Sequence, residues 1–501
     1  MRNRIRLHHG IIRMAIVMCA AATAAAQGPG VLERGFAAPP EETKPYVYWY
    51  WMSGNISREG ITRDLEAMNR VGIGAAFIGN IENVWDANPK TRGPVRMLTE
   101  EWWRLTEHAI REGKRIGVNI GMFNSPGWSQ SGGPWVAPSQ AMRYVIWSDT
   151  KVKGPARINT RLPAPAEKFE DIATLAIPAS PPGAEPVSSR SPRVTTHPAA
   201  PGAGVLFDGR HDAEWEVPKK EIIIDVETGA PFSARSLVLH AAQRPTAVRG
   251  ELQAGDGTGA FKRVCEIVFK RQTGGSHPPG FGAELYGPLS IAFPAVRAKH
   301  FRFVMSGSGA LVELELTGEY WLDNFLEKTL AKPVLSHQPL WDSYIWPAQR
   351  GPDSPGLVIK PASIINLAKH VGTDGSLRWD APKGDWIIRR FGMTPTPAYN
   401  FPAAPEARGP EIDKMSRPLV RHHYGQFIGK LLSRMPAEDR SALRYIVADS
   451  YEQGSQNWTD GFAADFQKRY GYDPIPFMPA FSGRVVDSPD ITERFLWDLR
   501  R

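Results

Sequence analysis

Apolar and polar positions alternate along the first part of the chain in a way that predicts strand, helix, strand, helix, strand. Aromatic residues dominate the first run, and the helical segments show apolar residues three and four positions apart. Ser57 and Thr99 stand where helix N-caps are expected, and Gly117 stands where the second helix should end. The predicted elements are a strand at Tyr46–Trp51, a helix after Ser57, a strand at Gly74–Ile78, a helix from Thr99 to Gly117 and a strand at Val118–Met122. This order is typical of a parallel α/β unit.

The same alternation resumes near the C-terminus. A helix is predicted around Tyr424–Leu431, a strand at Tyr445–Ala448, and a helix at Thr459–Tyr470 with Phe462 and Phe466 facing inward. We therefore expect a (β/α) barrel built from residues 27–160 and 321–501. Only about five or six of the eight strands of such a barrel can be recognised, so we expect it to be incomplete in this chain.

Between these parts, residues 205–320 form short alternating runs separated by turn residues, which predicts an inserted β-sandwich. The runs are Glu221–Val226, Ser236–His240, Ala247–Gln253, Arg263–Val268, Leu289–Phe293, His300–Met305 and Leu311–Leu316. The segment Leu206-Phe207-Asp208-Gly209, followed by Trp215, resembles the opening of galactose-binding-like modules. A purely structural role is the favoured interpretation, because a sandwich needs no ligand to fold. Residues 161–204 are rich in Pro and Ala and are expected to be a linker or surface excursion.

The first 26 residues have the pattern of a secretory signal peptide. Four arginines precede an apolar run, Met14–Ala26, that ends in small residues. The run is too short for a transmembrane helix, which needs about 20 apolar residues. We expect cleavage near Ala26 and a secreted or periplasmic protein with no transmembrane segment. Cleavage would also remove Cys19 and leave Cys265 without an internal partner.

The charge balance argues against a nucleic-acid partner. The 60 basic and 52 acidic residues among 501 give a formal net charge of +8. The signal peptide carries four of the arginines (8 − 4 = +4 remaining), and the remaining surplus is not clustered.

Polar and aromatic residues gather where three of the predicted strands end. The three stretches are Trp49–Asn55, Asn124–Trp135 and Asp449–Trp458. Flat rings and directional amides and hydroxyls together suit a sugar, and barrel active sites lie at the C-terminal ends of strands. A set of capped turns without a ligand is the alternative. Two Asn-X-Ser/Thr triplets, at Asn55 and Asn457, match the acceptor pattern for N-linked glycans. We interpret both as chance matches, with Ser57 and Thr459 serving as helix caps.

Glu452 is the strongest single candidate for a catalytic residue. Hydrolysis of a glycosidic bond needs a carboxylic acid that protonates the departing oxygen and a second carboxylate that activates water or attacks. Burial beside Tyr451 and Trp458 would keep Glu452 protonated by raising its pKa. Asp449 could raise it further, or bind a sugar hydroxyl or a cation. A solvated Asp-X-X-Glu pair without function is the alternative.

Several segments of the sequence resemble the motifs of one enzyme family. Lys44–Ser57, Glu59–Leu65, Glu101–Trp103, Asn124–Trp135 and Asp449–Thr459 resemble the motifs of α-L-rhamnosidases of glycoside hydrolase family 106. The resemblance implies a secreted, calcium-dependent, inverting enzyme with Glu452 as general acid acting on a rhamnose-containing oligo- or polysaccharide. It places four residues near the bound rhamnose: Asn55, Asn124, Trp128 and Asp449. Trp458 is a further substrate-binding candidate. Glu411 and Asp413 could reach the sugar or the ion. The equal alternative is that these two residues lie in an exposed charged turn.

The chain is shorter than members of this family and stops at Arg501 within a helical stretch, Ile491–Arg501. We therefore expect it to be the N-terminal part of such an enzyme and poorly active alone. The general base, some calcium ligands and the remaining barrel strands would lie beyond this end, and no metal ligand is assigned within the chain. Two other classes stay open: a non-catalytic carbohydrate-binding protein, and a hydrolase for another deoxysugar.

Overall fold

The computed structural model describes residues 29–37, 39–84, 91–256, 259–271, 286–329, 348–448 and 456–501. The chain divides into two compact units. The first unit contains the residues up to Gly127 together with Ile428–Val447, and the second contains Trp128–Phe427 together with Ala448–Arg501.

The first unit is built on a four-stranded parallel sheet. Its strands are β1 (Tyr46–Met52), β2 (Ala75–Ile81), β3 (Asn119–Phe123) and β15 (Leu443–Val447), in the order β1-β2-β3-β15. All three neighbouring pairs are parallel, so the carboxyl ends of the four strands lie at one edge of the sheet. The strands predicted at Tyr46–Trp51, Gly74–Ile78 and Val118–Met122 are confirmed, with shifts of one to three residues at their ends.

Helices connect these strands as the sequence predicts. In α3 (Arg58–Arg70) the Ser57 hydroxyl accepts a hydrogen bond from Gly60 N, and in α4 (Glu100–Ile116) the Thr99 hydroxyl accepts one from Trp102 N. Gly117 ends α4 with a φ of +88°, a conformation that glycine adopts without a steric penalty. Both predicted N-caps and the predicted helix end are therefore confirmed. A short helix, α2 (Pro29–Ala37), and α7 (Lys430–Arg434) also belong to this unit.

The two faces of the parallel sheet differ in burial. Trp49 and Trp51 of β1 are buried, and the Trp49 indole donates to Asp64 of α3 over 3.0 Å. On the other face, Tyr46, Tyr48 and Tyr50 remain exposed. The period of two along a strand explains this alternation.

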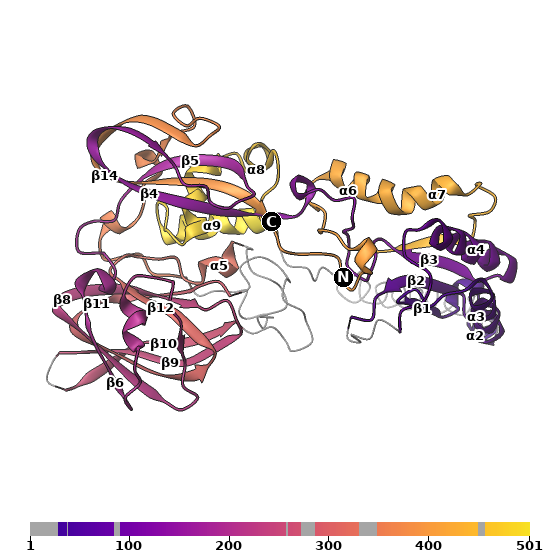
Figure 1. Cartoon of the computed structure of the whole chain (residues 1–501), viewed down its shortest axis with the longest axis horizontal. Helices are drawn as coiled ribbons and strands as arrows, with labels where there is room; N and C mark the ends of the chain where they lie inside the picture. The colour runs from indigo at the N-terminus through magenta and orange to yellow at the C-terminus, as the bar shows by residue number, and fades with distance from the viewer. Residues whose placement is uncertain are drawn as a thin grey trace, which may run out of the picture. The chain divides into compact units, whose positions relative to one another are not determined.

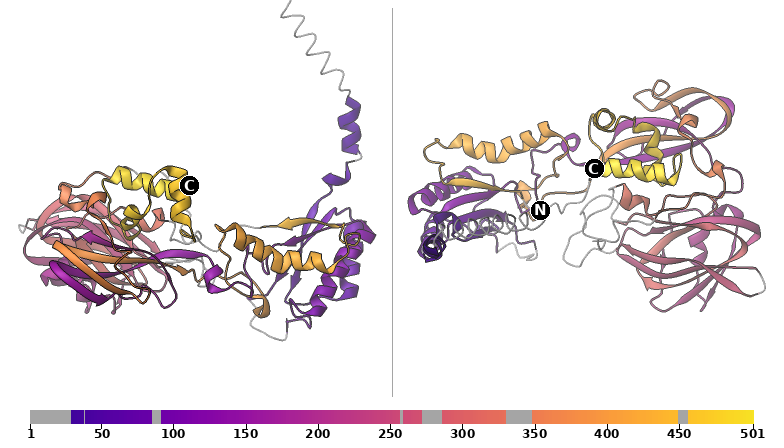
Figure 2. Two further views of the ribbon diagram at one scale, coloured as in Figure 1. Left: turned by 90° about the horizontal axis from the view of Figure 1, so that it is seen from above. Right: turned by 180° about the vertical axis from the view of Figure 1, so that it is seen from behind.

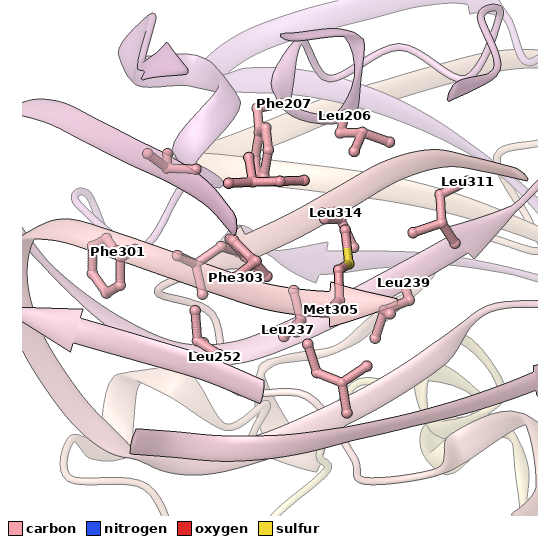
Figure 3. Close-up of a cluster of buried hydrophobic side chains, with 14 of the residues drawn as sticks. Leu206, Phe207, Leu237, Leu239, Leu252, Phe301, Phe303, Met305, Leu311 and Leu314 are labelled. Carbon is pink, nitrogen blue, oxygen red and sulfur yellow. The ribbon is translucent and has the colours of Figure 1, made fainter. Parts of the chain in front are cut away.

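The larger sheet of the second unit has seven strands in the order β10-β9-β11-β8-β12-β7, with β6 paired to β8 (Figure 1). All pairs within it are antiparallel. The strands are β6 (Arg193–His197), β7 (Trp215–Glu216), β8 (Ile222–Ala241), β9 (Thr246–Gly255), β10 (Phe261–Arg271), β11 (Leu289–Ser308) and β12 (Ala310–Thr317). Alternate side chains of these strands meet in one buried cluster that includes Leu237, Leu252, Phe303 and Leu314 (Figure 3).

A second antiparallel sheet stands as a separate layer of this unit (Figures 1 and 2). Its order is β13-β5-β14-β4, from β4 (Arg143–Arg161), β5 (Glu170–Pro178), β13 (Ile365–Asn366) and β14 (Ser376–Pro395). Residues 161–204 were expected as a linker or surface excursion, yet β5 and β6 lie within them. The proline-rich composition conceals apolar residues of β5 such as Leu175 and Ile177, which are buried in a core.

Helical segments complete the second unit. They include α5 (Phe325–Lys328), α6 (Arg417–Tyr424), α8 (Phe462–Tyr470), a 3-10 segment at Ile475–Ser482 and α9 (Pro489–Arg500). The helix predicted around Tyr424–Leu431 consists of α6, a π-helical turn at Gly425–Gly429 and α7. In the part of the chain that the structure describes, no helix is long and apolar enough to cross a membrane.

The fold class is thus mixed α/β with extensive β-sheet. Four parallel strands are described, and a closed barrel is not formed by the described residues. The barrel, the sandwich and the other domain ranges expected from the sequence stay predictions.

Candidate functional site

Polar residues lie at the carboxyl edge of the parallel sheet in the first unit. Ser53 and Gly54 turn the chain after β1 with φ values of +47° and +73°. The Asn55 side-chain amide then donates to Met52 O over 3.1 Å and to Thr91 O over 2.9 Å. These bonds hold the loop in place while the residue stays exposed. Asn55 is therefore positioned by the turn that follows β1.

Asn80 and Asn124 lie at the same edge. Asn80 is opposite Trp51 in the register of β1 and β2, and its side-chain oxygen accepts a hydrogen bond of 2.9 Å from the Trp102 indole. Asn124 directly follows β3, and its backbone N–H donates to Val447 O over 2.8 Å. The structure thus brings the predicted residues Asn55 and Asn124 to one edge of one sheet. Their contact with a sugar stays a prediction.

Glu82 is a carboxylate at this edge that the sequence analysis missed. It follows directly after β2, and its Oε1 lies 2.9 Å from Nε of Arg92. Its Oε2 is buried and has no hydrogen-bond partner among the described residues. The strand was expected to end at Ile78, three residues early, so the polar segment Asn80–Asn83 was not recognised as a strand end. If the strand is extended to Ile81, polar residues follow the strand end, as they do in the stretches Trp49–Asn55, Asn124–Trp135 and Asp449–Trp458.

Asp449 and Glu452, the sharpest sequence candidates, lie outside the described residues. The described residues end at Ala448, one residue after β15, and begin again at Gln456. The structure therefore places the residues that flank the 449–455 segment.

A buried polar network in the second unit surrounds Asp413. Oδ1 of Asp413 accepts hydrogen bonds from Nε2 of Gln456 over 2.6 Å and from Met415 N over 2.9 Å. Oδ2 accepts from the Thr459 hydroxyl over 2.6 Å and from Nη2 of Arg143 over 3.2 Å. Each oxygen therefore has two donors, as a buried carboxylate requires. The network joins residues before and after the 449–455 segment.

Glu411 lies beside this network and is equally buried. Its Oε2 accepts from the Ser131 hydroxyl and from Nζ of Lys414, both over 2.6 Å. Its Oε1 is buried and has no hydrogen-bond partner in the described part of the chain. The exposed charged turn considered for Glu411 and Asp413 is wrong, because both side chains have no exposed surface.

Arg143 supplies the main positive charge of the cluster. It is 1% exposed and binds Asp413, Glu170 and Asp460. Burial by itself lowers the pKa of Arg143, but the hydrogen bond and charge of Asp460, with the charge of Glu170, raise it overall. The guanidinium therefore stays charged and links β4 to the residues that follow the 449–455 segment.

The residues after that segment are held firmly. Asn457 accepts from Val145 N over 2.8 Å and donates to Thr329 O over 2.9 Å, and it is 2% exposed. Such burial is incompatible with a glycan, in agreement with the interpretation of its triplet as coincidental. The predicted capping role of Thr459 is wrong: α8 begins after Gly461, and the Thr459 hydroxyl binds Asp413 instead.

The two predicted tryptophans of this unit have different surroundings. Trp458 is buried, with its ring 4.6 Å from that of Phe462 and 6.0 Å from that of Phe481. Trp128 is half-buried, with its ring edge-on to Phe401 at 6.2 Å. Substrate contact by either residue stays a prediction.

The described residues contain no ready-made cluster of side-chain ligands for the calcium ion that the family resemblance implies. Calcium takes six to eight oxygen ligands, usually with several carboxylates. No group of three or more His, Cys, Asp or Glu side chains suited to a metal occurs among the residues that the structure describes. The oxygens of Asp413 already accept four hydrogen bonds, one of them from a cation.

Comparison with known proteins adds independent information. The sequence model of glycoside hydrolase family 106, described as alpha-L-rhamnosidase, matches residues 37–501. A protein from Formosa agariphila named "Putative beta-glucuronidase" is 29% identical over 473 residues, covering 94% of this chain and 28% of its own length. The structure of a rhamnosidase from Novosphingobium sp. PP1Y superposes with a TM-score of 0.77 at 27% identity, covering 94% of this chain and 44% of that one. The chain therefore spans less than half the length of either relative.

Proposed function

The chain belongs to the α-L-rhamnosidases of glycoside hydrolase family 106, and from this premise we propose that it removes terminal α-L-rhamnosyl residues from plant or microbial glycans. The proposed reaction is inverting hydrolysis. Glu452 protonates the departing glycosidic oxygen, and a second carboxylate, which we do not assign, activates the attacking water.

The observation that carries this proposal is the shared carboxyl edge of the four parallel strands. Glu82 and Asn124 lie directly after β2 and β3, and Asn55 lies in the turn that follows β1. In the sequence, Asp449 follows the end of β15 by two residues and Glu452 by five. Parallel strands collect the groups that follow them at one edge, as in barrel enzymes. Amide groups there can bind sugar hydroxyls while carboxyl groups act on the bond.

We assign sugar-binding roles to the remaining residues at this edge and beyond it. Glu82 is proposed to accept a hydrogen bond from a sugar hydroxyl through Oε2, which has no partner among the described residues. Trp128, Asp449 and Trp458 are proposed as further sugar-binding residues on the family resemblance alone. Glu411 and Asp413 are buried within the second unit, where Asp413 holds Gln456 and Thr459.

We extend the proposal to the finer architecture. The parallel sheet would form part of a (β/α) barrel, and the seven-stranded sheet would be a galactose-binding-like sandwich inserted into it. This is supported by the parallel order of the first sheet and by the antiparallel order of the second.

We also propose that the protein is secreted or periplasmic. The support is the basic start and short apolar run of the first 26 residues. N-terminal sequencing of the protein recovered outside the cytoplasm should begin close to Gln27. An intact Met1 on exported protein would contradict this part of the proposal.

The test of the proposed reaction is the turnover of 4-nitrophenyl α-L-rhamnoside by the protein and by two variants. Glu452→Gln should reduce kcat by at least about 100-fold, because general acid catalysis contributes 10²–10⁴-fold. Binding of rhamnose to this variant should persist. Glu82→Gln should raise KM by about ten-fold, since a hydrogen bond to a charged group contributes about 1.5 kcal/mol or more.

The result also separates the competing functions. Rhamnose binding without turnover in the unmodified protein would favour a non-catalytic carbohydrate-binding protein. Faster turnover of the 4-nitrophenyl α-L-fucoside would favour another deoxysugar, and faster turnover of the β-D-glucuronide would favour the activity named for the Formosa relative. Neither binding nor turnover of any of these would overturn the proposal.

Calcium dependence remains a separate proposal that rests on the family resemblance. Treatment with EDTA should lower turnover, and added calcium should restore it. Unchanged turnover after chelation would contradict it.

A further inference from the structure

Residues 151–161 of β4 and 376–387 of β14 pair within the second unit and form a ribbon whose two faces differ in character (Figure 1). On one face, Val152, Ile158, Trp379 and Trp386 pack in a hydrophobic core. Successive side chains of a strand point to opposite faces, so the odd-numbered residues of β4 point away from this core. The opposite face of the ribbon is therefore its solvent face.

The solvent face of the ribbon carries more cations than acidic residues. Asp380, opposite Arg157, and Asp385, opposite Lys153, are the acidic residues that the register places there. The cations at the paired positions of this face are all exposed: Lys151, Lys153, Arg157 and Arg161 of β4 and Arg378 of β14. Cations thus exceed acidic residues by three. Because they occupy alternate positions of two strands, this surplus forms no basic run in the sequence.

A surface cavity of about 640 Å³ lies against this face, and its walls include Arg157, Arg378 and His370. Arg378 has no ion-pair partner among the described residues. Arg157 lies 3.2 Å from Asp380, but these two side chains are 84% and 78% exposed, and ion pairs in such positions contribute little stability. Both guanidinium groups are therefore accessible to an anionic ligand that arrives from solvent.

The spacing of the charges suits a polymer whose negative groups are far apart. Neighbouring cations of β4 are two or four residues from one another, which corresponds to about 7–13 Å. Duplex DNA carries one negative charge per about 1.7 Å of its axis, so that Asp380 and Asp385 would lie against its phosphates. A glycan with one carboxylate or sulfate group per sugar can place these groups beside the cations, and guanidinium groups bind such anions through paired hydrogen bonds.

We propose that the solvent face of the ribbon is a binding surface for an anionic glycan chain, distinct from the carboxyl edge of the parallel sheet in the first unit. Arg157 and Arg378 would bind negative groups in the cavity, and the other cations would attract the chain along β4. Such a surface raises the local concentration of an acidic substrate without taking part in hydrolysis. The inference rests on the proposed function only in taking a glycan as the polymer.

The test is calorimetric titration of the full chain with polygalacturonate, which is anionic and contains no rhamnose. This polymer should bind, and neutral dextran should not. A variant with both Arg157→Gln and Arg378→Gln should bind it about five-fold more weakly or less well still. The matched control carries Lys219→Gln and Lys220→Gln, which remove two exposed cations between β7 and β8, and should change the affinity by less than about two-fold. All four side chains are exposed, so no buried contact is lost.

Ionic strength provides a second measurement. Raising the salt concentration from about 50 to 200 mM should weaken the binding of polygalacturonate to the unmodified protein more than to the arginine variant, which releases fewer ions. Three results would each overturn the inference. They are binding of polygalacturonate no tighter than that of dextran, an equal loss in the arginine and lysine variants, and tighter binding of duplex DNA at the same ionic strength.

Failure of the proposed reaction gives a different result. The arginine variant should turn over 4-nitrophenyl α-L-rhamnoside, which has no charge, at the unmodified rate. If the unmodified protein shows no turnover but polygalacturonate binding still depends on the two arginines, the inference stands without the enzyme. If turnover is normal and polygalacturonate does not bind, the inference falls while the proposed function stands.

Discussion

At the scale of single residues, burial decides what each charged group does. Glu411 and Asp413 occur in a short polar stretch that could equally be a surface turn, yet both are fully buried. Asp413 is balanced by Arg143 and by neutral donors from Gln456 and Thr459. Because the partners are distant in sequence, no local pattern distinguishes this arrangement from an exposed turn.

The buried pair of Arg143 and Asp413 should be important for stability. Arg143→Met leaves the carboxylate of Asp413 buried without its cation, and we expect the free energy of unfolding to fall by about 3–5 kcal/mol. Arg157→Met is the matched control, because Arg157 lies on the same strand in an exposed pair with Asp380 and should cost about 1 kcal/mol at most. Urea denaturation measures both, and equal losses would contradict the prediction.

Glu313 should make stability depend on pH. Burial, with smaller contributions from Asp208 and Glu315, raises the pKa of Glu313 from 4.5 to about 8. The folded state therefore favours the protonated form. Its contribution to stability is complete below about pH 4.5 and is lost as the pH rises to about 8.

Removing this carboxyl group should remove that dependence. Glu313→Gln should resemble the unmodified protein at pH 5 but be more stable at pH 8, by on the order of 2 kcal/mol. Urea denaturation at both pH values provides the measurement, with the exposed Glu221→Gln as control. A pH dependence that survives in Glu313→Gln would show that another group is responsible.

At the scale of elements, local patterns were sufficient wherever a helix is capped or a strand alternates. The Ser57 and Thr99 caps and the end of α4 at Gly117 are set within a few residues of sequence. The strands β4 and β14 were missed because their buried positions include arginines. Arg389 and Arg390 of β14 are buried against Asp149 and Asp171. Such charges look like surface residues until their partners are known.

The N-cap of α3 gives a prediction at this scale. Ser57→Ala removes the acceptor for Gly60 N and should lower the free energy of unfolding by about 1 kcal/mol. Ser57→Gly, which also lacks the hydroxyl, should cost only a few tenths of a kcal/mol, about 0.3, because glycine suits this position. Thermal and urea denaturation compare the two variants, and an equal loss would argue against a capping role.

At the scale of the whole molecule, separated segments make each core. The parallel sheet combines strands from residues 46–123 with β15, which begins at Leu443. In the other unit, β4 and β14 pair along almost their full lengths although more than two hundred residues separate them. Three strands of the carboxyl edge come from residues 46–123, and β15 adds the strand that precedes Asp449 and Glu452 in the sequence.

Cys265 provides a probe of the seven-stranded sheet. Burial raises the pKa of its thiol to about 12, so that little of the reactive thiolate is present at pH 8. In a Cys19→Ser background, the folded protein should react with Ellman's reagent far more slowly than the unfolded chain. Samples labelled for a fixed time at increasing urea concentrations should show a rise in labelled Cys265 where this sheet unfolds. Rapid labelling of the folded protein would contradict the prediction.

The sequence alone determined the mixed α/β class, the first strands and helices with their caps, the alternating strands of the central region and the family, because each is expressed in local periodicity or contiguous motifs. Tertiary structure decided that Glu82 joins the carboxyl edge, that Glu411 and Asp413 are buried around Arg143, and that Thr459 binds Asp413 instead of capping a helix. It also brought cations of β4 and β14 to one face of a single ribbon. These features depend on contacts between residues that are far apart in the chain, and the burial that gives a charged or polar group its role arises only when those segments pack together.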